Sequence, residues 1–519
     1  MAMIREGSGE PQGGAPVDRE GSGEPQGGAP VDQDRPTRAR SFDSTSPATG
    51  EVVGSFPLDG PEQVAAAVAR AREGQRRWAE LGFDGRRRAL QAYKAMLVRR
   101  TDELVALVHR ENGKPHADAL LEVVLIVEHL DWAARNAARV LGRRRARTTM
   151  LLANHAAWVE YQPLGVVGVI GPWNYPVFTP LGSVVYALAA GNAVVFKPSE
   201  LTPAVGCFLA DTFADAVGDP PVFQVVTGDG TTGHALCLAG VDKVALTGSP
   251  ATGRKVMAAC AERLTPVVLE LGGKDAMVVD ADADADLEAA AEQALWGGMA
   301  NAGRPAWPSS GCTWSTRSTT GSWPGWSSGR PRSGPAASPA PTSAPSPSRG
   351  SSRSSGGTWT TPSPAEPGRW SAAGTPSARP TSTPVVLVDV PADALILREE
   401  TFGPVLPVVR ARDAGHAVEL ANANPYGLGA AVFAGRRADR IARALRSGMT
   451  SINSVLTYAG IPSLPLGGVG ESGFGRIHGP TASASSPAPR PSPASASPCP
   501  SGCRASTAPA SSSRPSARP

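Results

Sequence analysis

Three short stretches decide the fold of this chain: GVIGPWNYP (168–176), VVFKPSE (194–200) and VVLELGGKD (267–275). In each, an apolar run rich in β-branched residues leads directly into glycine, proline and polar residues. Such runs are typical of strands buried on both faces of a parallel sheet. Helical periodicity over 204–216 and 254–263 alternates with them. The sequence therefore predicts an α/β fold built on a doubly wound, Rossmann-type sheet.

Polar side chains follow these predicted strands at their carboxyl ends. Asn174, Lys197 and Glu270 each come at or just after the end of an apolar run. The carboxyl ends of parallel strands meet at one edge of a sheet, where α/β proteins bind their ligands. We therefore expect these three residues to line one site.

Length, charge and cysteine usage narrow the class of protein. A chain of 519 residues is long enough for two or three domains with sizeable cores. Its 50 basic and 46 acidic residues give a net charge of +4, which offers no argument for a nucleic-acid partner. The six cysteines show no metal-ligand spacing, so no metal site is expected. With no apolar leader and no run long enough to span a bilayer, the sequence predicts a cytoplasmic protein without a membrane partner.

The first part of the chain divides into a tail, a helical region and a ribbon. The segment REGSGEPQGGAPVD occurs twice in succession, and its composition predicts a disordered tail over 1–40. Two short strands around a turn are expected over 41–57. Periodicity then predicts helices over 61–81, 85–112 and 117–141. Residues 143–162 alternate apolar and polar side chains, which predicts an exposed ribbon that pairs with another subunit.

The character of the chain changes abruptly in two later segments. Residues 304–384 contain no Leu, Ile, Val, Met, Phe, Tyr or Lys, yet they hold six tryptophans. Residues 481–519 form a tail of mostly Ser, Pro, Ala and Arg. Both compositions predict disorder. We therefore expect the strand near 385–390 to lack its neighbours, leaving an open sheet edge, and the ribbon to lack a C-terminal partner strand.

Six motifs in order carry a resemblance to a known family: GPWNYP, KPSE, TGSPATG, LELGGK, EETFGP and PLGGVGESGFG. Together they resemble the aldehyde dehydrogenase superfamily over roughly 41–303 and 385–479. The resemblance implies oxidation of a small-molecule aldehyde to a carboxylic acid with NAD(P)⁺, through a cysteine thiohemiacetal and thioester. It also implies a homodimer or homotetramer. The domains it implies are a cofactor domain (41–142 and 163–271), an oligomerisation ribbon (143–162) and a catalytic domain (272–303 and 385–465).

The resemblance implies catalytic roles for two matching residues. Asn174 would donate its side-chain amide to the oxyanion, and Glu270 would be the general base that activates water. Lys197 and Glu200 would bind the adenine ribose, and the Glu200 carboxylate would repel a 2′-phosphate. NAD is therefore favoured, with NADP possible.

Further residues match the cofactor-binding pattern. Gly248 and Ser249 would contact the pyrophosphate at a helix N-terminus, although GSPATG by itself is more often an ordinary turn. Glu400 and Phe402 would hold the nicotinamide ribose and ring, with a packing role for Phe402 as the alternative. The other residues expected at the cofactor are Ile170, Gly171, Pro172, Trp173, Ser199, Gly230, Thr247, Gly253 and Leu271.

The nucleophile that the family requires is missing. The family places its cysteine in a segment resembling N-x-G-Q-x-C, but here Asn301-Ala302-Gly303 is followed by Arg304, and Ala306 stands at the thiol position. Alanine cannot form a thiohemiacetal, and loss of a nucleophile typically costs on the order of 10⁶ in turnover. Cys312, six positions beyond Ala306, is interpreted as accidental.

A shift of reading frame accounts for the departure. Read from Arg304 with synonymous bases chosen freely, the shifted frame allows TCVAVERVYVVH, whose cysteine codon straddles Pro305 and Ala306. The same shift makes 357–371 an amphipathic helix and 481–497 a family-like C-terminal segment. We therefore interpret 304–384 and 481–519 as out-of-frame. Three hypotheses follow: an aldehyde dehydrogenase inactive as printed, a non-catalytic dinucleotide-binding remnant, or a non-folding pseudogene product.

Overall fold

The computed structural model describes most of the chain after the N-terminal tail. The described residues are 40–280, 287–304, 312–315, 384–455, 457–480, 482, 487–491 and 495–496, with the backbone alone for 312–315, 487–491 and 495–496. The predicted tail over 1–40, except for residue 40, lies outside them, as do Ala306 and most of 304–384 and 481–519.

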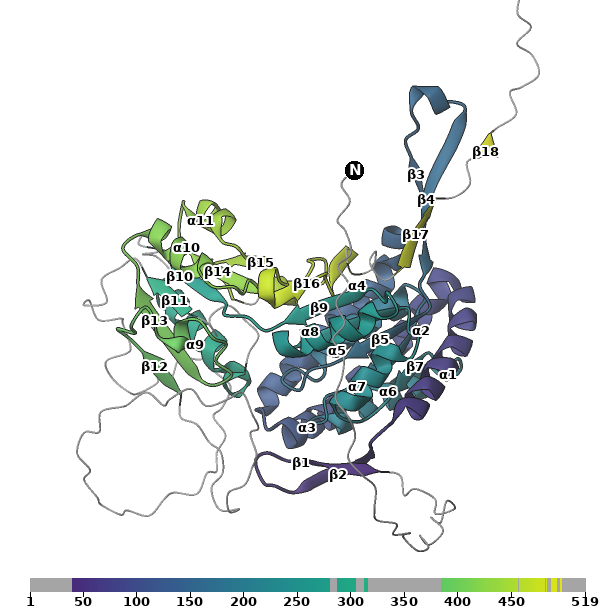
Figure 1. Cartoon of the computed structure of the whole chain (residues 1–519), viewed down its shortest axis with the longest axis horizontal. Coiled ribbons are helices and arrows are strands. Elements are labelled where there is room, and N and C mark those ends of the chain that lie inside the picture. Colours follow the sequence, from purple (N-terminus) through teal and green to yellow (C-terminus); the bar gives the residue numbers. More distant parts are fainter. Residues whose placement is uncertain are drawn as a thin grey trace, which may run out of the picture. The chain divides into compact units, whose positions relative to one another are not determined.

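A six-stranded sheet carries the stretches that begin the sequence argument (Figure 1), in the order β16-β9-β8-β5-β6-β7. Its parallel strands are β5 (Val166–Ile170), β6 (Ala193–Lys197), β7 (Phe223–Val225), β8 (Lys243–Gly248) and β9 (Val267–Leu271). β16 (Gly473–Phe474) pairs with β9 antiparallel. The predicted strands and the predicted α/β class are confirmed. Because β5 and β6 are buried along their whole length, their apolar runs are continuous, not alternating.

Helices cover this sheet. They are α1 (Pro61–Glu80), α2 (Gly82–Arg99), α3 (Thr101–Asn112), α4 (His116–Leu141), α5 (Phe178–Ala189), α6 (Pro203–Val217), α7 (Gly230–Leu238) and α8 (Pro250–Ala261). The expected helices over 61–81, 117–141 and 204–216 match within a residue. α8 begins earlier than expected, because Ser249 caps it by accepting a hydrogen bond from the backbone of Thr252.

The single helix predicted over 85–112 is wrong. The backbone leaves the helical region at Arg100 (φ −99°, ψ 19°), which separates α2 from α3. The Thr101 hydroxyl donates to the carbonyls of Leu97 and Val98, so the end of α2 finds partners there. Arg100 is held in turn by Glu103 of the next helix. Apolar periodicity continues across this break, which is why the pattern concealed it.

A second sheet has all its strands parallel, in the order β12-β13-β11-β10-β14-β15. These are β10 (Ala276–Val279), β11 (Cys312–Ser315), β12 (Val385–Leu387), β13 (Val405–Arg410), β14 (Gly429–Phe433) and β15 (Met449–Ile452). The helices beside it are α9 (Leu287–Gly303), α10 (Ala414–Asn422), α11 (Ala438–Ala444) and α12 (Thr457–Gly460). Alternate residues of β10 enter two different apolar clusters, Val278 in one and Met277 in the other, because side chains alternate across a strand.

The expectation that the strand near 385–390 lacks neighbours is wrong in part, because β12 pairs in parallel with β13. β12 is still the end strand of the described sheet, so the expected open edge stays a prediction. β11, from the segment 304–384, pairs with β10 and β13. Strand ladders are made by backbone groups, so even a segment poor in strand-forming residues can take a place in the sheet.

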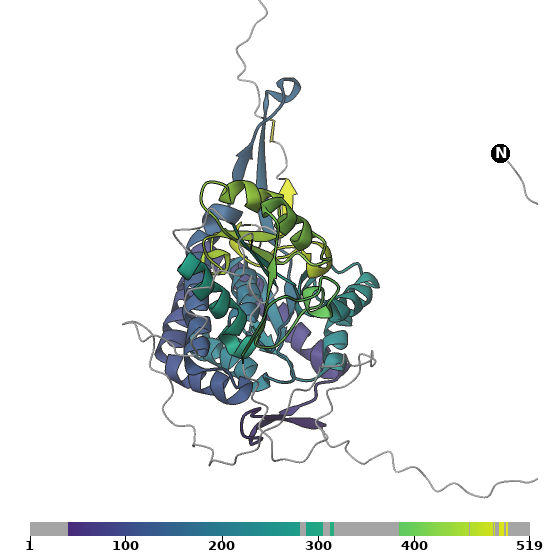
Figure 2. The ribbon, with the colours of Figure 1, turned by 90° about the vertical axis from the view of Figure 1, so that its left-hand side faces the viewer.

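A ribbon projects from the helical body (Figures 1 and 2). Its strands β3 (Arg144–Ala146) and β4 (His155–Pro163) are antiparallel. β17 (Pro487–Pro491) and β18 (Ser495–Ala496) also pair with β4, so the expected loss of a C-terminal partner strand is wrong. The prolines of β17 stand at alternate positions, which leaves the intervening N–H groups for the ladder.

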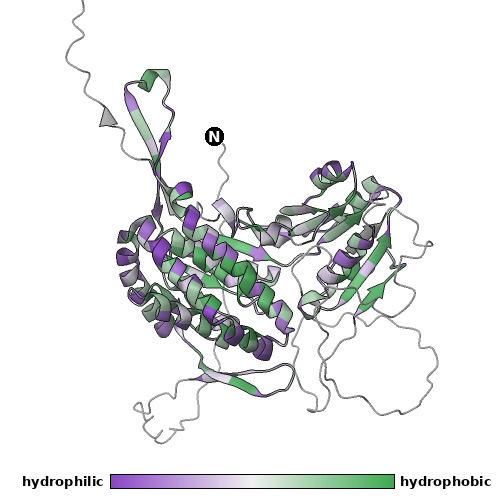
Figure 3. Cartoon of the chain, turned by 180° about the vertical axis from the view of Figure 1, so that it is seen from behind, coloured by the Kyte–Doolittle hydropathy of each residue, from purple (hydrophilic) through white to green (hydrophobic). Residues whose placement is uncertain are grey.

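The remaining elements are short. β1 (Ser41–Thr45) and β2 (Val52–Pro57) form the expected antiparallel hairpin. Single 3-10 turns occupy Met150–Leu152, Leu395–Leu397 and Gly470–Ser472. The largest apolar cluster lies between the first sheet and its helices, and Figure 3 shows hydrophobic strands inside with hydrophilic residues on the outer helix faces. This packing holds the carboxyl edge of the sheet in place.

Candidate functional site

A cavity of about 1440 Å³ lies at the carboxyl edge of the first sheet. Sixteen of the residues singled out from the sequence line it: Ile170, Gly171, Pro172, Trp173, Asn174, Lys197, Ser199, Glu200, Gly230, Thr247, Gly248, Ser249, Glu270, Leu271, Glu400 and Phe402. The structure therefore brings together side chains that come from both sheets of the chain.

Gly253 is not among the lining residues. A Cβ on Gly253 would come within 2.8 Å of the Leu271 side chain, so this glycine lets α8 pack closely onto β9. Its place in the structure is at a helix–strand contact and not at the wall of the cavity.

Lys197 and Glu200 lie at the end of β6. The Lys197 ammonium is buried, donates to the Pro198 carbonyl at 2.7 Å and lies 3.7 Å from the Glu200 carboxylate. Burial lowers the pKa of Lys197, and Glu200 opposes this change. The Glu200 side chain is half exposed, so its carboxylate is accessible to a ligand.

Two helix N-termini border the cavity. α8 starts at Pro250, after the cap Ser249, and α7 starts at Gly230, after the cap Asp229, whose carboxylate accepts from the Thr231 backbone at 2.8 Å. The backbone N–H groups and small residues at such ends suit an anionic group.

Glu270 is the next-to-last residue of β9 and lines the cavity. It is 7% exposed and accepts a hydrogen bond from the Thr247 hydroxyl at 2.9 Å. Burial raises the pKa of Glu270 to about 7, so near neutral pH it can both take up and release a proton. A carboxyl group with these properties is suited to general-base chemistry.

Glu400 approaches from the second sheet. Its carboxylate accepts from the Gly273 backbone at 3.3 Å and fills the space that a Cβ on Gly272 would need. Phe402 lies edge-on to Trp173, with ring centroids 5.6 Å apart, and both rings line the cavity. Phe402 is 44% exposed, which leaves one side of its ring open.

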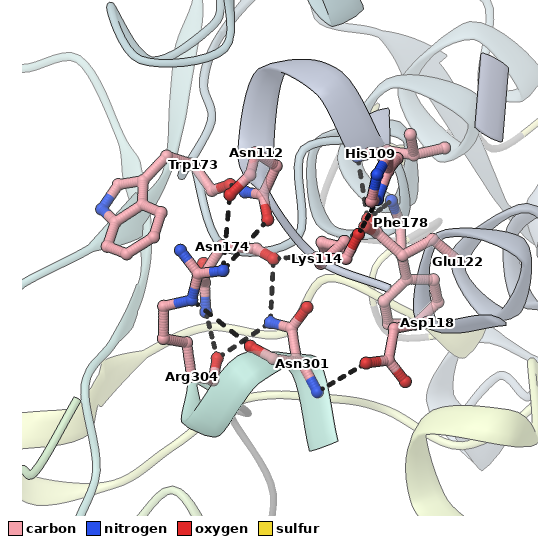
Figure 4. A network of polar contacts seen from close by, with 11 residues as sticks. His109, Asn112, Lys114, Asp118, Glu122, Trp173, Asn174, Phe178, Asn301 and Arg304 are labelled. Carbon is pink, nitrogen blue, oxygen red and sulfur yellow. Dashed lines mark hydrogen bonds and ion pairs between the residues drawn. The ribbon is translucent and has the colours of Figure 1, made fainter. Parts of the chain in front are cut away.

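The loop that carries Asn174 is fixed by buried side chains of α4 and of the short connection between α3 and α4 (Figure 4). Lys114 donates to the Asn174 carbonyl and to the Glu122 carboxylate, both at 2.6 Å. The other carboxylate oxygen of Glu122 accepts from the backbones of Val177 and Phe178, both at 2.9 Å. Lys114 and Glu122 are completely buried, so the loop after β5 is tied down by a charge pair without access to water.

The Asn174 amide faces the kinked C-terminal end of α9, where the backbone leaves the helical region at 300–302 (Figure 4). Its Nδ2 donates to the Arg304 carbonyl at 3.3 Å, and the amide of Asn301 donates to the carbonyls of both Asn174 and Arg304 at 3.0 Å. Asn301 and Ala302 are left-handed, each with φ 56°, and Gly303 follows with φ 76°. The turn thus delivers the backbone of Arg304 to the amide.

Arg304 also places its guanidinium in this region. The group lies over the Trp173 ring at 5.0 Å and contacts the Asn112 carbonyl at 3.4 Å. Burial lowers the pKa of Arg304. Ala306, the residue at the expected thiol position, lies outside the described residues.

The sequence argument missed several residues of the cavity wall. Gly60 and Pro61 at the start of α1, Thr231 in α7 and Lys255 in α8 line the cavity, and so does Asp275. Only Asp275 had a visible signal, because it directly follows the LELGGK motif. In the described part of the chain no three His, Cys, Asp or Glu side chains are placed to hold a metal, and no helix is long and apolar enough to cross a membrane.

A parallel sheet with two helix N-termini and a lysine–glutamate pair at its carboxyl edge defines an α/β protein suited to binding a dinucleotide. The model of the aldehyde dehydrogenase family matches residues 35–311 and 374–485, and the chain belongs to this family. The relatives and solved structures that resemble it agree with this assignment.

Among curated proteins, the chain is 35% identical over 458 residues to the 4,4'-diapolycopene aldehyde oxidase of Methylomonas sp, covering 84% of this chain and 82% of that protein. It is similar to an NAD-dependent aldehyde dehydrogenase from Sinorhizobium meliloti, with 29% identity, a TM-score of 0.73, and coverage of 87% and 91%. It is also similar to an NADP dependent enzyme from E. coli, with 27% identity, a TM-score of 0.71, and coverage of 87% and 94%.

Proposed function

We propose that this chain derives from an aldehyde dehydrogenase that oxidises a small-molecule aldehyde to a carboxylic acid, and that as printed it binds the dinucleotide without turnover. The observation that carries the proposal is the cavity wall, which gathers Asn174, Lys197, Glu200, Glu270 and the N-terminus of α8. A nicotinamide dinucleotide bound there would accept the hydride.

The residues of this chain would share the remaining work. Lys197 and Glu200 would bind the hydroxyls of the adenine ribose, and Gly248 and Ser249 would bind the pyrophosphate. Glu270 would take a proton from water, which its pKa near 7 allows. Because the Glu200 carboxylate would repel a 2′-phosphate, we propose NAD as the preferred cofactor.

Absence of turnover follows from the replaced nucleophile. Ala306 has no thiol, and the Asn174 amide already donates to the Arg304 carbonyl. The proposal that 304–384 and 481–519 are out-of-frame is supported by the family match, which stops at residue 311, resumes at 374 and ends at 485. We further propose that 41–142 with 163–271 is the cofactor domain, 272–303 with 385–465 the catalytic domain, and the ribbon an oligomerisation element of a homo-oligomer.

Two measurements on one preparation test the proposal. NADH fluorescence titration should show saturable binding, which Ser249→Tyr should weaken by filling the start of α8. An assay of NADH formation from NAD⁺ and an aldehyde should show no turnover above the enzyme-free rate. A matched chain carrying the shifted reading of 304–384 and 481–519 should gain turnover by several orders of magnitude, roughly up to 10⁶.

Each alternative predicts a different result. Turnover by the printed chain would contradict the assigned loss of the nucleophile. A chain that neither binds NADH nor shows a cooperative heat-capacity transition would instead support a non-folding pseudogene product.

A further inference from the structure

Asp275 is a buried carboxylic acid in the cavity wall that the proposed mechanism does not use. It follows β9 and precedes β10, is 3% exposed and lines the cavity. Neither of its carboxyl oxygens forms a hydrogen bond of normal geometry with the described residues, although the Gly429 backbone acts on the carboxyl group. The hydroxyl of Tyr458, 4% exposed, also lacks a partner there. Two buried polar groups without such hydrogen bonds, both beside Gly429, are costly, and groups of this kind are concentrated at functional sites.

Glycines create the space that Asp275 occupies. A Cβ on Gly429 would lie 2.7 Å from Asp275 Oδ2 and 2.5 Å from the Tyr458 hydroxyl, so both oxygens face the same α-carbon. A Cβ on Gly273 would lie 2.5 Å from Asp275 Oδ1. Any larger residue at Gly429 or Gly273 would displace the carboxyl group. The lack of a side chain at these two glycines therefore leaves the room that the Asp275 carboxyl group fills.

The surroundings of Asp275 favour its neutral form. Burial, together with the nearby carboxylates of Glu400 and Glu270, raises the pKa of Asp275 to about 8. The Gly429 backbone and the Lys274 ammonium oppose this rise, and Lys274 also donates to the Thr401 hydroxyl at 3.0 Å. The charged side chains that act on Asp275 are thus the Glu400 and Glu270 carboxylates and the Lys274 ammonium, and a positive charge entering the cavity would favour ionisation.

We propose that Asp275 is a proton switch for the redox state of the cofactor: it keeps its proton beside a neutral, reduced nicotinamide and releases it to solvent when the cationic, oxidised nicotinamide binds. This inference rests on the proposed binding of a nicotinamide dinucleotide in the cavity. The step moves one proton from the carboxyl group to water and moves no electrons. Its consequence is that the affinity for NAD⁺ relative to NADH increases with pH.

Calorimetric titration tests the proposal without requiring turnover. NAD⁺ and NADH are each titrated just below pH 8 in two buffers of different ionisation enthalpy, and the difference in heat gives the protons exchanged. NAD⁺ should release a large fraction of a proton, at most about one per site, and NADH should release almost none. The comparison of the two dinucleotides needs no variant, so it does not depend on a mutant folding.

Variants assign the proton to a residue. Asp275→Asn should remove most of the release, whereas Asp84→Asn, an exposed control on α2, should leave it unchanged. Equal release with NAD⁺ and NADH, or the same release by wild type and Asp275→Asn, would overturn the proposal. Glu270→Gln should leave most of the release in place. If neither dinucleotide produces a saturable heat, cofactor binding itself fails, and this inference fails with it.

Discussion

Two groups of buried ionisable side chains in this molecule contrast with each other. Behind the Asn174 loop, Lys114 and Glu122 are fully buried and paired at 2.6 Å, and Glu122 also accepts two backbone hydrogen bonds. In the cavity wall, Asp275 is also buried, but its carboxyl oxygens form no hydrogen bond of normal geometry in the described part of the chain. The first group has its charges compensated, and the second does not.

The difference teaches what each group does. A buried ion pair whose remaining donors and acceptors are satisfied fixes a geometry, here that of the loop from Trp173 to Phe178. An unpaired buried carboxyl cannot fix anything as strongly, but its protonation responds to whatever charge enters the cavity. The paired group therefore fixes the position of the loop, and the unpaired carboxyl group changes its protonation when a charge enters the cavity.

The largest expected effect is the loss of stability at alkaline pH caused by Asp275. Its folded-state pKa of about 8 lies above the ordinary value of 3.8, so its contribution is fully present below pH 3.8 and is lost as pH rises through 8. By this linkage, Asp275→Asn should be more stable than wild type above pH 8, by on the order of 5 kcal/mol at most. Urea unfolding at several pH values measures this difference. An unchanged pH profile in the variant would contradict a raised pKa.

Breaking the paired group should cost nearly as much at neutral pH. Lys114→Met leaves Glu122 buried without its cation, which is expected to cost about 3 to 5 kcal/mol of unfolding free energy. The double variant Lys114→Met with Glu122→Gln should recover part of this loss, because a neutral glutamine can still accept from the loop backbone. Equal stability of the single and double variants would show that charge compensation is not the reason for the pair.

Two buried histidines, His129 and His478, should lower the stability of the folded chain at acid pH, whereas Asp275 lowers it at alkaline pH. Burial lowers the pKa of His129 to about 4, and also lowers that of His478, whose ring lies 4.1 Å away. As pH falls, these two histidines are protonated in the unfolded chain before they are protonated in the folded one. The free energy of unfolding therefore decreases as pH falls from 6.5 to about 4. For His129 this loss is about 3 kcal/mol. Thermal unfolding of wild type and His129→Gln measures this loss. Between pH 6.5 and 4 the Tm of the variant should fall less steeply with decreasing pH than that of wild type, and equal slopes would refute the prediction.

The smallest expected effect comes from a charge pair that water reaches. Lys94 and Asp131 form an ion pair whose side chains are 24% and 22% exposed. Because solvent screens this pair, Lys94→Met should cost only about 1 kcal/mol in the urea unfolding experiment used for Lys114→Met. A loss as large as that of Lys114→Met would mean that burial does not explain the contrast between the two pairs.

Much of the fold and most of the cavity wall were predictable from the sequence. The strands at 166–170 and 193–197 coincide with buried apolar runs, and Asn174, Lys197 and Glu270 do line one cavity. The break at Arg100 was missed, because a helical pattern records which residues are apolar and not where the backbone bends. The pairing of β17 with β4 was missed because backbone pairing leaves little trace in composition. The pairing of β12 with β13 was missed because the neighbours of β12 were expected within 304–384.

By itself, the sequence determined which residues stand at the carboxyl edge of the sheet, and it put Ala306 at the position where the family resemblance predicts a thiol. These are local properties, since a strand and the residue after it are adjacent in the chain. Only the tertiary structure decided that Lys114 meets the Asn174 carbonyl and that Gly429 and Tyr458 converge on Asp275. These contacts join segments far apart in sequence, and their energy depends on burial and on the partners present. A local pattern of residues shows neither the burial nor the partners.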